Sequence, residues 1–216
     1  KFLQRNFGTE KIEEQLQETF PDAKVARMDM DTVRGKNAHD VLIQQFEQKR
    51  IDILVGTQMV VKGLDFDNVG WVGILDADGL LHFADFRVNE RAFQLMEQVS
   101  GRAGRKEDTG KVMVQTSQPT HPVLQFVQQH DFKNMFAEEL KKRKEFFYPP
   151  FSRIIHISFK HKIKQVVERA AQVYADAMKI KYGQYIVGPA EPVIGRIRNQ
   201  YLMELLLKLP RDGKTI

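Results

Sequence analysis

Short apolar segments alternate with helical patterns through the first 117 residues of this 216-residue chain, and this alternation constrains the fold most. The predicted strands are 24–29, 51–55, 69–75 and 111–115, and the predicted helices are 9–20, 36–49 and 86–99. Short apolar strands separated by helices are typical of parallel βαβ units, in which helices cover both faces of a buried sheet. Ligands of such folds bind beyond the carboxyl ends of strands. The segment after Val55 and the segment near residue 100 are therefore the candidate ligand-binding segments.

A second pattern begins after Ser117-Gln118-Pro119. Two helices are predicted at 121–129 and 132–147, and Tyr148-Pro149-Pro150 then ends the helical pattern because proline cannot continue a helix. A strand, a helix and further strands follow, at 152–159, 163–181, 185–187, 193–198 and 202–209. We therefore expect one domain over residues 1–147 and a smaller, incomplete α+β domain over residues 148–216.

Charge and cysteine content narrow the class of protein. Residues 148–216 hold 12 Lys and Arg against 5 Asp and Glu, whereas residues 1–147 hold 21 against 23. This asymmetry indicates a polyanionic partner for the second half, although a solvated basic face explains it equally well. The chain has no cysteine, which excludes disulfides and cysteine-ligated zinc from this stretch. No apolar run approaches 18 residues, so no membrane span is expected. The start at Lys1, without a methionine or a leader, indicates a piece of a longer chain.

Two glycines and two other small residues interrupt a helical pattern in one octet, Gln98-Val99-Ser100-Gly101-Arg102-Ala103-Gly104-Arg105. Each interior glycine costs about 1 kcal/mol relative to alanine, and such exceptions are expected at functional sites. The octet continues the predicted apolar helix, so Gln98, Arg102 and Arg105 share one face at i, i+4 and i+7. Two arginines three residues apart can converge on one anion, such as a triphosphate. A glycine-rich helix end with two surface arginines is the structural alternative.

The segment Gly56-Thr57-Gln58-Met59-Val60-Val61-Lys62-Gly63-Leu64-Asp65-Phe66 follows a predicted buried strand, where a ligand loop belongs. Thr57 and Gln58 offer hydrogen-bonding side chains, Gly63 permits special backbone angles, and the Asp65 carboxylate can accept hydrogen bonds from sugar hydroxyls. A strand followed by such a loop is weak evidence by itself.

Taken together, the two segments resemble motifs V and VI of the second RecA-like lobe of superfamily 2 helicases. Further strings narrow the resemblance to the primosomal replication-restart helicases, the primosomal protein N′ (PriA) family. These strings are Gly8-Thr9-Glu10, Arg27-Met28-Asp29-Met30-Asp31-Thr32, Gly56-Thr57-Gln58-Met59, Asp85-Phe86-Arg87 with Glu90-Arg91, and Tyr148-Pro149-Pro150-Phe151. The resemblance covers nearly the whole chain and implies an α/β RecA-like lobe followed by a small α+β domain.

The resemblance also implies roles for individual residues. Arg102 and Arg105 would face the γ-phosphate of ATP, and Gln98 would position the phosphate or couple the two motifs. Gly63 and Asp65 would lie beside the nucleotide. Thr57 and Gln58 would contact the DNA backbone or relay the nucleotide state. In other phosphoryl-transfer enzymes an arginine of this kind contributes roughly 10³–10⁵ in rate.

ATP and Mg²⁺ are the cofactors that the resemblance implies, bound together with a first lobe that carries the phosphate loop. Neither that loop nor the zinc-binding cysteines of the family occur in this sequence, so the chain alone is expected to be inactive and to hold no metal. The implied partners are single-stranded and forked DNA, single-stranded-DNA-binding protein and other primosome proteins, in the bacterial cytoplasm. Arg196 and Arg198 are candidate phosphate contacts in the second domain.

Two other functions stay open on the sequence alone. The chain can belong to another superfamily 2 translocase acting on DNA or RNA, or to a non-catalytic nucleic-acid-binding module. Among weaker candidates, Asp76-Ala77-Asp78 resembles a metal pair, but its place at a strand end favours hydrogen bonding. We expect Trp71 to pack in the core and assign none of the six histidines to a metal or to catalysis.

Overall fold

The computed structural model describes residues 8–29, 38–57, 69–101, 103 and 110–211. Contacts divide the chain into two compact units, residues 1–83 with 87–132, and residues 84–86 with 133–216. The predicted domain boundary after residue 147 stays a prediction. Within the described ranges, no helix is both long and apolar enough to cross a membrane.

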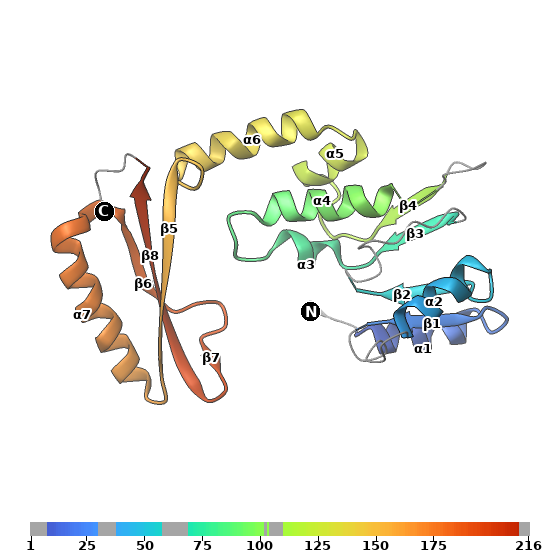
Figure 1. Ribbon diagram of the computed structural model, residues 1–216, viewed down its shortest axis with the longest axis horizontal. Helices are drawn as coiled ribbons and strands as arrows, with labels where there is room; N and C mark the ends of the chain where they lie inside the picture. Colours follow the sequence, from blue (N-terminus) through green and yellow to red (C-terminus); the bar gives the residue numbers. More distant parts are fainter. Residues whose placement is uncertain (1–7, 30–37, 58–68, 102, 104–109, 212–216) are drawn as a thin grey trace. The chain divides into compact units, whose positions relative to one another are not determined.

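The first unit opens with two strands that pair in parallel. Helix α1 (Thr9–Thr19) precedes β1 (Val25–Met28), and α2 (Ala38–Glu47) precedes β2 (Ile53–Gly56). Val25 pairs with Ile53 and Met28 with Gly56, so both strands end at the same edge. Met28 is fully buried beneath apolar side chains, which are Leu42, Ile43, Phe46, Leu54 and Val69. Figure 1 shows α1 and α2 beside this strand pair.

A second parallel pair completes the strands described in the first unit. It joins β3 (Trp71–Ile74) to β4 (Lys111–Val114), with α3 (Ala77–Leu81) and α4 (Val88–Ser100) between them in the chain and α5 (Pro122–Gln128) after them. Helix α4 buries its apolar stripe, which comprises Ala92, Phe93, Met96 and Val99. The expected α/β class with parallel strands is therefore confirmed.

The prediction that β3 and β4 are buried strands is wrong, because no side chain of either strand is buried. Trp71 is 63% exposed and Met113 61% exposed. Because side chains alternate along a strand, and Trp71 pairs with Lys111 while Gly73 pairs with Met113, these residues share one face of the ribbon. The Lys111 ammonium lies 4.9 Å from the Trp71 ring centroid. The expectation that Trp71 packs in the core is thus corrected, since most of this residue is exposed and its ring lies beside a cation.

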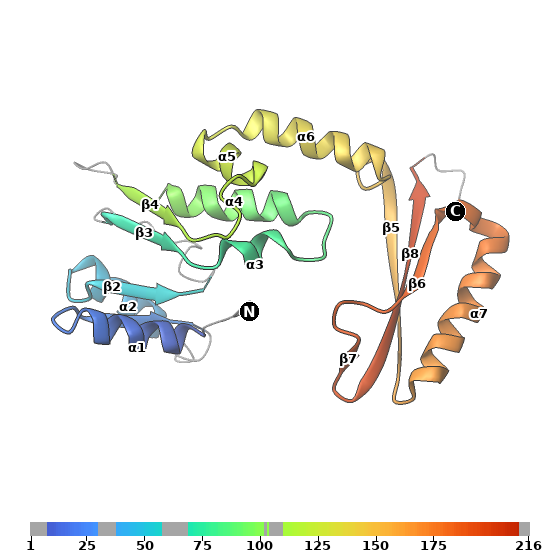
Figure 2. The ribbon, with the colours of Figure 1, turned by 180° about the vertical axis from the view of Figure 1, so that it is seen from behind.

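The second unit contains one antiparallel sheet. Helix α6 (Phe132–Glu145) leads into β5 (Ser152–His161), α7 (Lys164–Tyr182), the 3₁₀ turn η2 (Gly183–Tyr185), β6 (Ile186–Ala190), β7 (Arg196–Ile197) and β8 (Gln200–Pro210). The strand order is β5-β8-β6, and β7 pairs with β8 as a hairpin. Figure 2 shows α7 running along this sheet. The core between helix and sheet is formed by Val167, Ala171 and Ala175 of α7 with Leu205, Leu207 and Leu209 of β8, because these three leucines alternate onto one face of the strand. The predicted α+β class of this part is correct.

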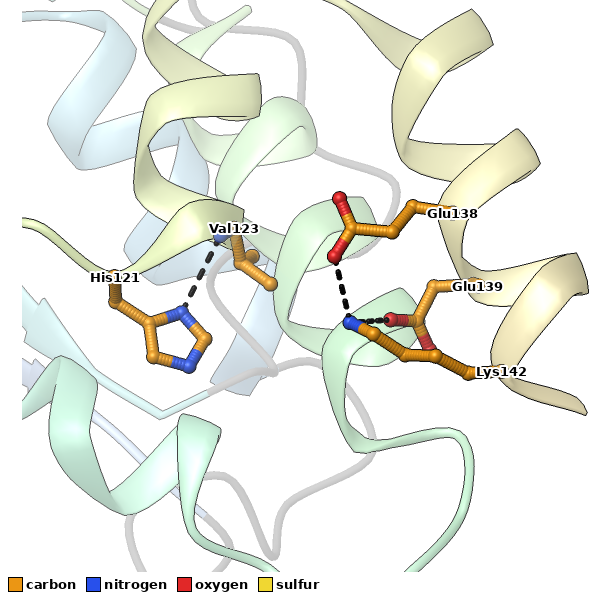
Figure 3. A network of polar contacts seen from close by, with 5 residues as sticks. All are labelled: His121, Val123, Glu138, Glu139 and Lys142. Atoms are coloured by element: carbon orange, nitrogen blue, oxygen red, sulfur yellow. Dashed lines mark hydrogen bonds and ion pairs between the residues drawn. The ribbon is translucent and has the colours of Figure 1, made fainter. Parts of the chain in front are cut away.

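Polar side chains stabilise helices α5 and α6 (Figure 3). The Val123 amide donates to His121 Nδ1 at 3.3 Å, which caps α5. Along α6, Lys142 Nζ lies 2.9 Å from Glu138 Oε1 and 3.1 Å from Glu139 Oε1. Partial burial favours the neutral amine of Lys142, but its hydrogen bonds to both carboxylates raise its pKa above the ordinary value. The two ion pairs therefore keep Lys142 protonated next to the buried Glu139.

Candidate functional site

Thr57 is the part of the first predicted ligand loop that the structure describes. It follows β2 directly and is exposed at the carboxyl edge of the β1–β2 pair. Asp29 follows β1 at the same edge, because Met28 pairs with Gly56. Gln58, Gly63 and Asp65 lie outside the described residues, so their predicted roles stay predictions.

Asp29 organises this edge, a role that we did not infer from the sequence. Its buried carboxylate accepts a hydrogen bond of 2.6 Å from Thr9 Oγ1 and lies 3.4 Å from Arg27 Nη1. Arg27 Nε in turn lies 3.4 Å from Glu13 Oε2. Two of the strings that carried the resemblance thus meet, and they fix the start of α1 against the end of β1. A polar residue immediately after a strand was the signal that could have pointed to this contact.

The second predicted ligand segment begins inside α4. Gln98 is exposed in the last turn of the helix, and α4 ends at Ser100, where the Gly101 amide donates to the Glu97 carbonyl at 3.0 Å. Ala103 continues as a bend whose amide donates to the Ser100 carbonyl at 3.2 Å. Regular helix therefore ends before Gly101, and the expectation that Gln98 shares one helical face with both arginines stays a prediction. Arg102 and Arg105 lie outside the described residues.

The Glu97 side chain ties the end of α4 to the segment after α5. Its two carboxylate oxygens lie 3.0 and 3.1 Å from His130 Nδ1. His130 adopts a positive φ of 53°, a backbone conformation uncommon for a residue with a side chain. This contact positions the helix that precedes the predicted arginine segment.

The carboxyl ends of β3 and β4 carry a hydrogen-bonded cluster around Asp78. Its carboxylate accepts from Thr116 Oγ1 at 2.5 Å, from Ser117 Oγ at 2.5 Å and from the Ser117 amide at 2.8 Å. The Ser117 hydroxyl, then the Thr116 hydroxyl and the Ser117 amide, lower the pKa of Asp78 to about 2. Asp76 adopts a φ of 54° and accepts from the Gly79 amide at 3.3 Å. The hydrogen-bonding interpretation of this aspartate pair is confirmed.

His82 completes the cluster. Its Nδ1 lies 2.7 Å from the Asp78 carbonyl oxygen, which only accepts, so Nδ1 carries the proton. Its Nε2, 2.9 Å from Gln118 Nε2, then accepts from the amide NH₂. The cluster fixes the loop after β4 onto α3, and across the described ranges no three metal-ligating side chains gather in one place.

In the second unit, Arg196 and Arg198 lie at the tip of the β7–β8 hairpin. Arg198 and Asn199 form its two-residue turn with φ of 47° and 63°, as a type I′ turn requires. The Arg196 guanidinium lies 4.8 Å from the Tyr201 ring centroid and donates to Asn199 Oδ1. Both arginines are exposed, two residues apart at the hairpin tip, and their role as phosphate contacts stays a prediction.

Comparison with known proteins decides the family. Residues 2–107 match the family model described as "Helicase conserved C-terminal domain", and residues 144–215 match "Primosomal protein N C-terminal domain". The chain is 43% identical, over 97% of its length, to the replication restart protein PriA of Synechocystis sp.. This chain belongs to the PriA family. It is also 40% identical, over 95% of its length, to PriA of Bacillus subtilis and 40%, over 94%, to PriA of Treponema pallidum.

The chain spans 25%, 26% and 31% of the lengths of these three PriA relatives. Both predicted ligand segments fall inside the helicase match, and Tyr148-Pro149-Pro150-Phe151 falls inside the PriA C-terminal match. The resemblance inferred from the sequence strings is therefore confirmed, and the roles of individual residues remain to be tested.

Proposed function

We propose that this chain forms the second RecA-like lobe and the C-terminal domain of an ATP-dependent DNA helicase that restarts replication. The observation that carries the proposal is the pair of family matches, in PriA order, on two separate compact units. The parallel strands of the first unit support it, because ligand loops of such folds follow strand ends and Thr57 is exposed at one of them.

In this proposal Arg102 and Arg105 complete the ATP site from the side of this lobe. Their guanidinium groups stabilise the charge that develops on the γ-phosphoryl group, and electrostatic stabilisation of this kind is usually the largest single term in catalysis. Gln98, exposed in the last turn of α4, lies within a few residues of both and couples them to the loop after β2. Gly63 and Asp65 bind the nucleotide, with Asp65 at the ribose.

ATP supplies the driving energy when it is bound between this lobe and the phosphate-loop lobe. Thr57 and Gln98 are exposed, and their hydroxyl and amide groups suit hydrogen bonds to phosphate and nucleic acid. Among the described residues no carboxylate cluster for Mg²⁺ is present. Mg²⁺ is then held by residues of the other lobe, and this chain alone does not hydrolyse ATP.

Nucleic acid is contacted from both units in this proposal. Thr57 and Gln58 bind the DNA backbone, and Arg196 and Arg198 bind phosphates at the hairpin tip. The surplus of basic residues in 148–216 supports single-stranded and forked DNA as ligands. Single-stranded-DNA-binding protein and other primosome proteins are the proposed protein partners.

Unwinding of a forked DNA duplex by the full-length protein tests the proposal. Arg105→Ala should abolish ATP-dependent unwinding, whereas Arg50→Ala, an exposed arginine after α2, should leave it unchanged. Full unwinding by Arg105→Ala would remove this residue from the ATP site. If the wild-type protein binds DNA but neither hydrolyses ATP nor unwinds the duplex, this result would favour the non-catalytic nucleic-acid-binding module instead.

A further inference from the structure

Helix α7 has a second apolar face in addition to the one buried on the sheet. Val167, Ala171 and Ala175 are buried. A separate exposed line of apolar residues, spaced alternately by three and four, consists of Ile163, Val166, Ala170, Val173, Ala177 and Ile180. Val173 is 62% exposed and Ile180 91% exposed. We call this line the α7 seam; nothing in the proposed function uses it.

The α7 seam forms one wall of an open groove. The other wall is Phe159 of β5, the strand at the edge of the described sheet, and the Tyr174 ring meets the Phe159 ring edge-on at 5.5 Å. The groove has a volume of about 630 Å³ and is largely open to solvent. Its lining consists of Phe159, Val166, Arg169, Ala170, Val173, Tyr174 and Ala177. An apolar groove of this shape fits the side chains of a polypeptide better than an enclosed small molecule.

The charge beside the groove is positive. Arg169 lines it, and the exposed Lys162 lies next to Ile163, at the start of the seam. Neither side chain forms an ion pair with another described residue. Asp176, seven residues after Arg169, is already engaged, because it accepts from Gln172 at 2.8 Å and lies 3.7 Å from Lys179 Nζ. Residues 152–182 hold seven Lys and Arg against two Asp and Glu.

We propose that this groove binds an amphipathic helix of a partner protein whose apolar stripe is flanked by acidic residues. The alternating spacing of the α7 seam is that of a coiled-coil interface, which accepts apolar side chains of a facing helix into its holes. Charged residues that flank such a seam select the partner by sign, so Lys162 and Arg169 favour glutamate or aspartate. A nucleic acid would use the cations but leave the apolar floor unpaired, so it fits this surface less well.

A designed peptide of about three heptads, with leucine on the seam and glutamate on both flanks, provides the probe. Its affinity for the full-length protein is measured by fluorescence anisotropy. Val173→Asp should weaken binding at least about tenfold, because it places a charge in the apolar interface. Val193→Asp, at a position 87% exposed outside the groove, is the matched control and should bind as the wild type does. If Val173→Asp is unstable, Ala177→Glu takes its place, because glutamate has a high helix propensity and also puts a charge in the apolar interface.

The charge selection is tested by a swap. Arg169→Glu should weaken the glutamate-flanked peptide about tenfold and strengthen its lysine-flanked counterpart. Equal binding to wild type and Val173→Asp would overturn the proposal. The proposal would also be overturned if a thymidine oligonucleotide fully displaced the peptide and only Arg169→Glu prevented this displacement. The surface would then be a polyanion site. A dimer of the protein that Val173→Asp dissociates would also overturn it, because a second copy would occupy the groove.

Discussion

The ring of Phe86 stacks on the ring of Tyr148, with centroids 4.9 Å apart and planes inclined by 9°. A cation lies over each outer face: Lys208 Nζ is 3.7 Å from the Tyr148 centroid, and the Arg143 guanidinium is 5.0 Å from the Phe86 centroid. Phe86 belongs to Asp85-Phe86-Arg87 and Tyr148 to Tyr148-Pro149-Pro150-Phe151. Two strings that narrowed the resemblance to the PriA family thus form one column, and residues 84–86 join the second unit although their chain neighbours belong to the first.

This column should contribute a measurable coupling energy. Phe86→Leu and Tyr148→Leu, alone and combined, should show an interaction of about 0.5–1.5 kcal/mol in the free energy of unfolding by urea, because stacked rings stabilise beyond the area they bury. Phe86→Leu combined with Phe20→Leu at the end of α1 should be additive. Additivity of the Phe86 and Tyr148 changes would show that the stack adds nothing to stability.

Asp78 should make the first unit sensitive to acid. Its pKa is about 2 in the folded chain against an ordinary value of 3.8, so the unfolded chain takes up the proton first as the pH falls. The stabilisation is complete above pH 4 and is lost as the pH falls towards 2. Asp78→Asn lacks this contribution, so its urea midpoint should fall less than that of the wild type between pH 4 and 2. Parallel curves for the two proteins would contradict the hydrogen-bonded carboxylate.

Arg198 allows charge and turn geometry to be separated. Arg198→Asn keeps a residue that tolerates positive φ while removing the charge, so the hairpin should persist. If Arg198 contacts a phosphate, the slope of log K against log salt for a thymidine oligonucleotide should become shallower by about 0.7. Arg153→Asn, on the exposed edge strand β5, is the control for a general loss of charge. An unchanged slope in Arg198→Asn would mean that this arginine is only solvated.

The elements were predictable because their periodicity is local. The apolar stripe of α4 and the short run before Gly56 each predicted their element to within a few residues. The exposure of Trp71 was not predictable, because an apolar strand shows that it can be buried and not which neighbours cover it. The five-residue helix α3 was missed for a similar reason, since its start depends on Asp76 at positive φ rather than on an apolar pattern.

The candidate site was predictable only in part. Residue types and spacing led to the correct family, and the position of Thr57 follows from its strand. The contacts of Asp29 with Thr9 and of Phe86 with Tyr148 join residues 20 and 62 positions apart, which no local pattern specifies. The end of α4 at Ser100 was not predictable either, because the sequence does not show which of the two glycines, Gly101 or Gly104, ends the helix.

The most direct test of the central claim is the DNA-stimulated ATPase rate of the full-length protein with Arg105→Ala. If this arginine acts on the transferring phosphoryl group, kcat should fall at least about 100-fold while the affinity for single-stranded DNA stays within about twofold of the wild type. A kcat near the wild-type value, with DNA affinity equally unchanged, would contradict the assignment of this segment to the ATP site.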